Sequence, residues 1–347
     1  MIATRTTPLS ALFARIKAEM VSLGVWYSSP ADEAAMRMWL KTAWLDCGCN
    51  TDFAIFTQPA NQLSIQFSVR VATSGHRVNV YWGDGSTDSV APATGSNTSL
   101  AKTYVTGALR PIIMLGRVTR FESVNNDGKT HFGGRITWLR SLTYLSWGGN
   151  NTGTGSVTGM PLTTLSWTGS NTGSGSVTGM PLTVLNWYGN NTGTGSVTGM
   201  PLTTLSWGGN NTGSGSVTGM PLTVLNWGGN NTGTGSITGM PLTSLVWGGN
   251  NTGTGWGAVA ASATGLCYMY HGGLTVLDAA EVNAILAGFW ANRNAAKSRA
   301  DRTIDIGKDT PTPNAAPTGQ GLTDKAALQA YRSPNNTGPA VWTVITN

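Results

Sequence analysis

The sequence predicts a mainly β protein built around a parallel β-solenoid of 20-residue coils. Residues 142–257 repeat the unit L-T-x-L-x-W-x-G-N-N-T-G-x-G-S-V-T-G-M-P almost without change. A fixed period of about 20 to 50 residues is typical of a solenoid, in which each coil packs only on its neighbours. Only 10% of the residues are charged, while glycine, threonine, serine and asparagine are abundant, which favours extended β structure over a typical cytosolic enzyme.

Residues 1–51 are predicted to form two short amphipathic helices. Apolar residues recur at helical spacing over residues 8–20, and Gly24 ends this pattern. Ser29 is a good N-cap for the second helix, because Pro30 and two acidic residues follow it in the first turn. We expect this segment to dock on a larger assembly. The alternatives are an interface between copies of the chain in an oligomer and a simple cap for the solenoid.

Residues 52–115 carry strand patterns. Residues 62–71 alternate strictly between polar and apolar, and residues 78–82 precede a tight Gly-Asp-Gly-Ser turn at 83–86. The run Val-Tyr-Trp-Gly-Asp-Gly at 80–85, with Thr103 and Tyr104 some distance later, resembles the PKD-like β-sandwich and its W-G-D-G hairpin. Asp84 favours turn formation, and a contribution to calcium binding stays open.

Residues 116–273 are predicted to form the solenoid, whose inner face is set by its apolar columns. In L-x-x-L-x-W the second Leu and the Trp alternate with a period of two, so both point inward from a short strand. The predicted core column is Trp147, Trp167, Trp187, Trp207, Trp227 and Trp247. The return half is rich in Gly and Pro, so we expect turns or a thin second strand around Val157, Val177, Val197, Val217 and Ile237 rather than a helix.

The pattern L-x-x-L-x-W-x-x-N resembles the leucine-rich repeat, with Trp at the third apolar position. The resemblance implies that the Asn side chains bond to the backbone of neighbouring coils as a ladder. The residues at this position are Asn150, Asn190, Asn210, Asn230 and Asn250. The sequence departs from the family in its Gly-rich return half.

The outward strand positions form the predicted contact face. They are Tyr144, Thr164, Ser166, Val184, Asn186, Thr204, Ser206, Val224 and Asn226. Small uncharged side chains dominate this face, and Tyr144 and Tyr188 lie too far apart to form an aromatic platform. Such a face suits a neutral spacer, a contact for host-surface glycan, or a contact for another protein.

The ends of the array are degenerate, as capping coils should be. Residues 118–126 fit the coil frame upstream, and Ala263, Leu266, Tyr268 and His271 fit it downstream, with His271 in the Asn position. Residues 274–347 are predicted to form a small α/β cap, in which Asp278 starts a helix over 279–290 and residues 303–306 form a strand. The ending W-T-V-I-T-N at 342–347 resembles the C-terminal cap of leucine-rich-repeat proteins in phage virions and in surface proteins of some bacteria.

Neither a catalytic site, a metal site nor a cofactor is predicted. The three histidines lie in different segments, and Cys47, Cys49 and Cys267 complete no set of metal ligands. The net charge of +6 comes from scattered Lys and Arg outside residues 141–270, so we expect no nucleic-acid binding. The sequence also holds no apolar run of about 18 residues, so we expect no membrane insertion.

The resemblances imply a non-enzymatic structural or adhesion component of a phage virion, in a tail fibre, a tail tip or another surface appendage. The expected partners are other virion proteins, through the N-terminal helices, and a host-surface glycan or protein; a homo-oligomer is left open. Met1 to Arg5 lack the apolar region of a secretory signal, which favours a virion assembled in the host cytoplasm. The alternatives are a bacterial cell-surface adhesin and a leucine-rich-repeat interaction scaffold.

Overall fold

The structure is a computed structural model of the 347-residue chain. It describes residues 6–25, 29–47, 52–58, 64–71, 76–93, 95–105, 109–123, 133–148, 152–169, 171–263, 265–273, 275–293, 302–307, 313–331 and 342–347.

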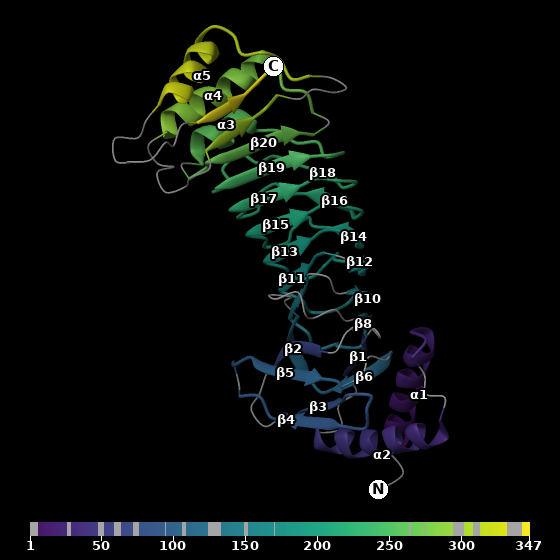
Figure 1. The fold of residues 1–347 in the computed structure, drawn as a ribbon. Coiled ribbons are helices and arrows are strands. Elements are labelled where there is room, and N and C mark those ends of the chain that lie inside the picture. The colour runs from purple at the N-terminus through teal and green to yellow at the C-terminus, as the bar shows by residue number, and fades with distance from the viewer. Residues whose placement is uncertain are drawn as a thin grey trace. The chain divides into compact units, whose positions relative to one another are not determined.

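The fold is mainly β, with a parallel β-solenoid of about seven turns and, among the described residues, five helices (Figure 1). This confirms the predicted mainly β solenoid. The chain divides into two compact units, and the division falls inside the repeat array. Unit 1 is Met1–Ser176 with Gly189–Thr192, and unit 2 is Val177–Tyr188 with Gly193–Asn347. No helix in the described part of the chain is both long and apolar enough to cross a membrane.

Unit 1 begins with the two predicted helices, α1 (Thr6–Ser22) and α2 (Pro30–Asp46). The Ser29 hydroxyl accepts a hydrogen bond from the backbone N–H of Ala31 at 3.2 Å, so the predicted N-cap is confirmed. The buried sides of both helices pack in one apolar cluster with side chains of the sheet strands that follow. That cluster includes Ile16, Met20, Leu40, Trp44, Phe53, Ile55, Ile113 and Leu115. The helices therefore cover a sheet.

Two sheets form the rest of unit 1. One has the order β10-β8-β1-β6-β3-β4 and contains β1 (Phe53–Gln58), β3 (Val78–Tyr81), β4 (Thr87–Val90), β6 (Arg110–Leu115), β8 (Gly133–Arg135) and β10 (Thr152–Thr154). The other has the order β5-β2-β7-β9-β11 within this unit and contains β2 (Ser64–Val71), β5 (Thr98–Thr103), β7 (Val118–Ser123), β9 (Tyr144–Trp147) and β11 (Thr164–Trp167).

Strands of the predicted sandwich and strands of the solenoid share these sheets. β2 pairs antiparallel with β7, and β7 pairs parallel with β9. On the other side, β8 pairs antiparallel with β1 and parallel with β10. The predicted boundary at 115/116 is therefore no break in the sheets. An aromatic core explains the continuity, because the ring of Phe56 lies 5.3 Å from that of Phe121 and 6.1 Å from that of Trp147, centroid to centroid.

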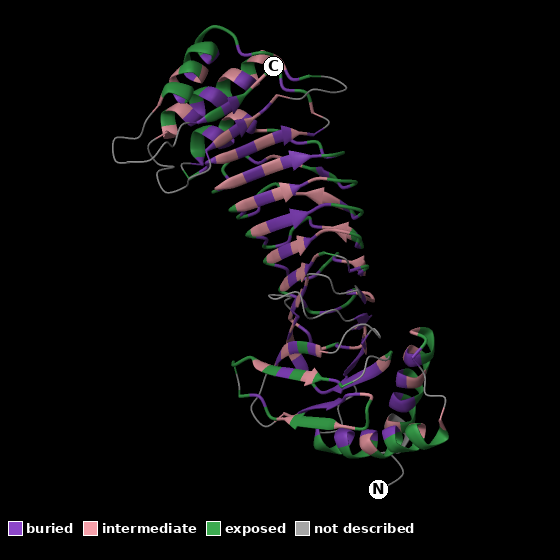
Figure 2. Ribbon diagram, viewed as in Figure 1, coloured by how far each residue is buried: buried purple, intermediate pink, exposed green. Residues whose placement is uncertain are grey.

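Unit 2 carries the repeated coils. Their inner strands are β13 (Val184–Trp187), β15 (Thr204–Trp207), β17 (Val224–Trp227) and β19 (Ser244–Gly248), paired in parallel so that each residue faces its equivalent in the next coil. The return half forms the predicted thin second strands. They are β12 (Ser174–Ser176, in unit 1), β14 (Thr192–Ser196), β16 (Thr212–Ser216) and β18 (Thr232–Thr234). Burial alternates along β13 and β17, as a strand with one face in the core requires, whereas on β15 Ser206 is buried as well (Figure 2).

Each coil holds its Trp between the inner strand and a glycine of the return strand. All six Trp of the predicted column are fully buried. A Cβ added to Gly173 would lie 2.6 Å from the ring of Trp167, and one added to Gly193 would lie 2.5 Å from the ring of Trp187. Glycine in the T-G-x-G segment is therefore required because the indole occupies the space of a side chain.

The indoles at the ends of β13, β15 and β17 also stack, whereas the ring of Trp247 meets that of Trp227 edge to face at an interplanar angle of 67°. The rings of Trp187 and Trp207 are 6.2 Å apart, centroid to centroid, with an interplanar angle of 5°, and those of Trp207 and Trp227 are 6.4 Å apart with an angle of 4°. A stack that runs from coil to coil adds aromatic contact to the shared backbone hydrogen bonds. This makes neighbouring coils mutually dependent.

The last coils exchange the thin strand for a helix. Three helix–strand pairs follow the array: α3 (Trp256–Ser262) with β20 (Tyr268–Gly272), α4 (Ala279–Asn292) with β21 (Thr303–Asp305), and α5 (Gln320–Ala330) with β22 (Thr343–Ile345). β19, β20, β21 and β22 pair in parallel, so the segment predicted as a cap continues the solenoid sheet. The Asp278 carboxylate accepts a hydrogen bond from the N–H of Glu281 at 2.8 Å, which confirms the predicted start of α4.

Candidate functional site

The outward positions of the unit 2 sheet form two rows of side chains. In one row, Val184, Thr204, Val224, Ser244 and Tyr268 face one another across β13, β15, β17, β19 and β20. In the other row, the same strands present Asn186, Ser206, Asn226, Val246 and Tyr270. We call these ten residues, together with Tyr188, the aromatic face. Adjacent strands are about 4.8 Å apart, so the rows form a regular surface.

The predicted contact residues divide between the two units. Six of them lie on the aromatic face: Val184, Asn186, Thr204, Ser206, Val224 and Asn226. The other three, Tyr144, Thr164 and Ser166, lie on the corresponding rows of β9 and β11 in unit 1. All are half-buried except Ser206, which is 8% exposed and counts as buried.

Tyr144 is covered within unit 1. The guanidinium carbon of Arg120 lies 3.4 Å from the centroid of the Tyr144 ring, and Arg120 pairs with Glu122 at 3.0 Å. The cation therefore occupies one side of the ring, as cation–π contacts favour. Tyr144 is engaged with neighbouring charges, whereas no Lys or Arg lies on β13, which precedes Tyr188, or on β20, which contains Tyr268 and Tyr270.

Two tyrosines of the aromatic face lie against glycines. A Cβ on Gly208 would be 3.3 Å from two carbons of the Tyr188 ring, and Tyr188 hydrogen-bonds Ser206 in the same neighbouring coil. Burial raises the pKa of the Tyr188 hydroxyl above its ordinary value, against a smaller opposing effect of that hydrogen bond. The Tyr270 ring covers Gly272, where an added Cβ would lie 2.8 Å from two ring carbons. A Cβ added to Gly248 would lie 3.7 Å from the same ring.

The prediction missed Tyr268 and Tyr270 because it placed the coil after the array in the wrong register. β20 pairs with β19 so that Met269 faces Leu245 and His271 faces Trp247. His271 therefore occupies the Trp column and not the predicted Asn position, and its buried ring lies 4.5 Å from that of Trp256. Tyr268, predicted to point inward, faces outward.

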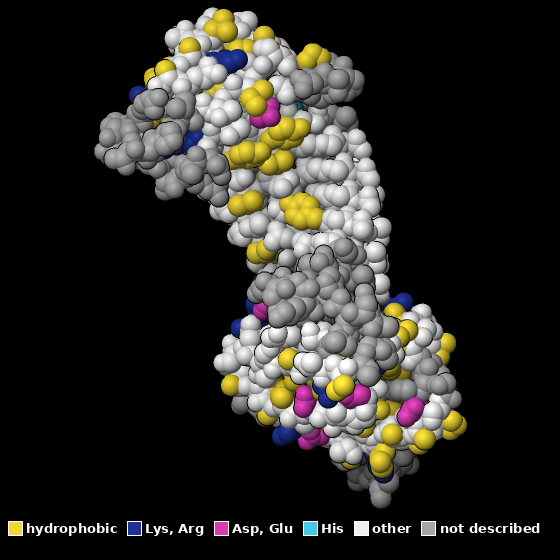
Figure 3. Space-filling model, in the orientation of Figure 1, with side chains coloured by type: hydrophobic (Ala, Val, Ile, Leu, Met, Phe, Trp, Pro, Cys, Tyr) yellow, Lys and Arg dark blue, Asp and Glu magenta, His cyan; other side chains and the backbone are white. Residues whose placement is uncertain are grey.

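The aromatic face carries no charged side chain. Residues 141–270 contain no Asp, Glu, Lys, Arg or His, and the first acidic residue on the adjoining strand is Asp305, which faces Tyr270 from β21. Figure 3 shows hydrophobic side chains gathered over the solenoid strands among uncharged ones. A ligand for this surface would meet aromatic rings, aliphatic side chains, hydroxyls and amides.

The asparagine ladder lies one residue later than predicted. Its members are Asn171, Asn191, Asn211, Asn231 and Asn251, all fully buried. The Asn211 side chain donates to the carbonyls of Trp187 at 2.8 Å and Gly208 at 2.6 Å, and it accepts from the N–H of Gly193 at 2.6 Å. The other members repeat the bonds to the preceding coil.

The predicted ladder positions are correspondingly not in the core. Asn190, Asn210, Asn230 and Asn250 are exposed, and Asn150 lies outside the described residues. The physical reason is that the first Asn lies on the surface of the turn that follows the inner strand, where water can bond to its side chain. The second Asn enters the core, where the carbonyls of the strand end need donors. Asn314 extends this role into the helical coils, because it donates to Ile306 O at 2.7 Å and accepts from Leu277 N at 2.8 Å.

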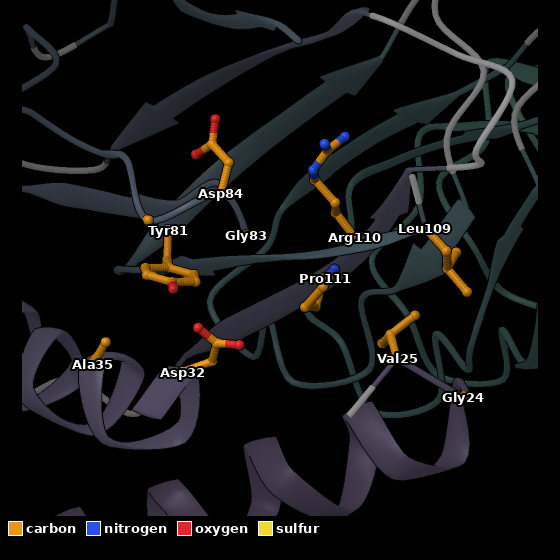
Figure 4. Close-up of a pocket in the computed structure, with 11 residues that line it drawn as sticks. Gly24, Val25, Asp32, Ala35, Tyr81, Gly83, Asp84, Leu109, Arg110 and Pro111 are labelled. Carbon is orange, nitrogen blue, oxygen red and sulfur yellow. The ribbon is translucent and has the colours of Figure 1, made fainter. Parts of the chain in front are cut away.

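Unit 1 has a cleft of about 470 Å³ beside the W-G-D-G turn (Figure 4). Its lining includes Asp32, Tyr81, Asp84, Arg110 and Pro111. The Asp84 carboxylate accepts hydrogen bonds from the N–H and hydroxyl of Ser86 and pairs with Lys102 at 3.1 Å. Partial burial acts to raise the pKa of Asp84, but these contacts outweigh it and hold the pKa below its ordinary value.

Asp84 therefore serves the turn. A calcium ion needs several oxygen ligands, and no group of three or more His, Cys, Asp or Glu suited to a metal occurs among the residues that the structure describes. The cleft brings one further carboxylate, that of Asp32, toward the same opening. Its chemistry is that of a mixed-charge surface cleft, and the aromatic face is the better candidate for recognition.

Comparison with protein families, curated proteins and solved structures gave no match.

Proposed function

We propose that the chain is a non-enzymatic structural and adhesion protein of a phage virion, in which the solenoid acts as a spacer and carries a contact surface. The observation that supports recognition is the aromatic face, an uncharged surface with three tyrosines. Tyrosine supplies large amphipathic contact area at a low entropic cost. The stacked coils beneath it hold the backbone rigid, which lowers the cost of ordering a binding surface.

The assignment to a virion rests on the resemblances of two segments. These are the W-G-D-G hairpin at 82–85 and the W-T-V-I-T-N ending at 342–347. The finer assignment of a PKD-like sandwich is supported by the local bonds of the hairpin, because the Tyr104 hydroxyl donates to Trp82 O at 2.8 Å and the Trp82 indole donates to Asp88 at 2.8 Å. The finer assignment of a leucine-rich-repeat-like cap is supported by α5 followed by β22.

The N-terminal helices are the proposed docking surface for other virion proteins. Their buried sides are engaged with the sheet, so docking falls to the apolar side chains that stay exposed: Val21 at 55%, Met38 at 72% and Leu45 at 51%. A hollow of about 250 Å³, lined by Leu9, Phe13, Arg37 and Leu40 among others, adds a concave feature to the same helices. Exposed apolar side chains are typical of protein contacts.

Location separates this proposal from its alternative, a bacterial surface adhesin. An antibody raised against the recombinant chain would be applied to purified phage particles and to envelope fractions from the same lysate. Detection in particles at a constant ratio to the capsid protein is expected. Detection in the envelope fraction alone would favour the adhesin and refute the virion assignment.

The non-enzymatic part has its own assay. The full chain would be incubated with purified bacterial envelope polysaccharide, and new reducing ends would be measured over time. No release above a heat-inactivated control is expected, and time-dependent release would overturn this part of the proposal.

A further inference from the structure

We infer that the aromatic face binds a neutral polysaccharide, with Tyr188 and Tyr270 as two stacking platforms on one track across the coils. This inference rests on the proposed adhesion function and names its ligand class. The ring positions, the spacing and the charge of the face each support it.

Both tyrosine rings lie against glycines of the sheet. Tyr188 lies against Gly208 and is tied to Ser206, and Tyr270 lies against Gly272 and reaches Gly248. Glycine at these positions removes the side chain that would push the ring away, so each tyrosine lies on the sheet. Both tyrosines stay half exposed. An aromatic ring held in this way offers a π surface whose negative potential attracts the C–H groups of a sugar ring.

The two rings lie over coils that are separated by one further coil. Gly208 belongs to the coil of β15 and Gly248 to the coil of β19, which are two strand spacings apart, or roughly 10 Å. Between them, Gly228 has no atom within 4 Å of the place where its Cβ would lie. The track therefore consists of a ring, an open step and a second ring. An extended sugar chain suits this arrangement, because one residue can stack on each ring while the chain crosses the open step.

The polar side chains between the rings fit sugar hydroxyls. Asn226 lies on β17, between the coils of Gly208 and Gly248, and Thr204 lies in the other row, on β15. Hydroxyl and amide groups can both donate and accept hydrogen bonds, as sugar hydroxyls can. Asn186 and Asn226 occupy the same row two strands apart, so a ligand with a repeat of roughly 10 Å can make the same bond twice.

The charge of the face selects a neutral polymer. No Lys or Arg lies on β13, β15, β17, β19 or β20, so a sulfated, phosphorylated or uronic-acid polymer would find no cation there. The nearest acidic row position is Asp305, whose carboxylate would repel an anionic chain that extends beyond Tyr270. A protein ligand is less well matched, because of the three residue types enriched in binding hot spots the face offers only Tyr and lacks both Trp and Arg.

The test uses the full chain in affinity gel electrophoresis. The gels contain a neutral polysaccharide (dextran, mannan, a soluble β-glucan or glycol chitin) or an acidic one (polygalacturonate, heparin or polysialic acid). Retardation by at least one neutral polymer and by none of the acidic ones is expected. Retardation only by acidic polymers, or by none of the seven, overturns the inference.

Three variants locate the site. Tyr188→Ala and Tyr270→Ala should each weaken binding by about tenfold, which corresponds to about 1.4 kcal/mol per platform. Tyr188→Phe keeps the ring and should bind within about threefold of the parent, which separates stacking from folding effects. Tyr144→Ala is the matched control, because that ring lies under Arg120 in unit 1, and it should bind like the parent.

Equal binding by the parent and both unit 2 alanine variants overturns the inference, as does an equal loss in Tyr144→Ala. The failure of the inference and that of the proposed function are distinguishable. If the chain is found in particles but no neutral polymer binds, the ligand assignment fails and the virion assignment stands. If the chain binds a neutral polymer through these tyrosines but is absent from particles, the reverse holds.

Discussion

Replacing Asn211 with alanine should destabilise unit 2 by at least about 2 kcal/mol. The substitution removes two donated bonds, to Trp187 O and Gly208 O, and one accepted bond, from Gly193 N, all in buried surroundings. Trp187 O keeps the hydrogen bond from the N–H of Gly208 at 3.1 Å, so two groups, Gly193 N–H and Gly208 O, lose their partner. Each buried polar group left without a partner costs about 1–3 kcal/mol. The cost is therefore larger than that of an average surface or core substitution, about 1 kcal/mol.

The assay is urea unfolding of the full chain, followed by far-UV circular dichroism and by tryptophan fluorescence. Asn210→Ala makes the same chemical change at the adjacent, exposed residue and should alter the free energy of unfolding by no more than about 0.5 kcal/mol. Equal effects of the two substitutions, or a larger effect at position 210, would refute the assignment of the ladder to the second asparagine. Agreement between the two signals is needed for a two-state free energy, because repeat arrays can unfold in parts.

Four further predictions follow from the packing and the charges. Gly213→Ala should destabilise by about 1–3 kcal/mol because its Cβ would enter the Trp207 ring, whereas Gly228→Ala, which meets open space, should be near neutral in the same unfolding assay. Trp207→Ala should cost about 3–5 kcal/mol, and an unchanged melting temperature would contradict its place in the stack. Deleting residues 202–241 removes two equivalent coils and should leave a soluble, cooperatively melting chain, whereas removing residues 274–347 uncovers α3 and the edge of β20 and should cause aggregation, measured by light scattering. Folding lowers the pKa of Asp84, so its ionised form stabilises unit 1 at neutral pH, and this stabilisation is lost as the pH falls through the folded pKa, below about 3.9. The difference in melting temperature between the parent and Asp84→Asn should therefore shrink on acidification. A difference that stays constant would argue against the lowered pKa of Asp84.

The repeat made the inner face predictable, because strict alternation of Leu and Trp admits only one inward side. The helix starts at Ser29 and Asp278 were predictable for a similar reason, since capping depends on a few adjacent residues. The predicted register of the ladder is wrong because the resemblance to the leucine-rich repeat places Asn at the first of two adjacent positions. The sequence did carry a signal for the second position: Ser170 interrupts the first column, whereas Asn171 keeps the second column unbroken.

Long-range pairing was the other part that the sequence left undetermined. Nothing local in residues 64–71 indicates that β2 pairs with β7 and so joins the solenoid sheet. Past the array, the loss of the Asn-Asn-Thr-Gly pattern removed the reference for counting, so the coil of β20 was placed three residues out of register and Tyr268 and Tyr270 were missed. The helix α3 was also missed, although Ala258, Ala260 and Ala261 favour a helix over the Gly-rich strand of earlier coils.

Near-identity of the coils has a consequence for how the chain finds its structure. The Leu, Trp and Asn residues that contact β15 recur in every repeated coil, so β15 could pair equally well with the equivalent strand of another coil. Lateral pairing therefore does not distinguish one coil from the next. The array therefore has several equivalent pairing registers, which differ by a whole number of coils. The segments at the two ends of the array have sequences that occur only once. They are the antiparallel pair of β2 and β7 at one end and the coils that contain α3 and α4 at the other. Their unique partners fix the register in which the repeated coils pair.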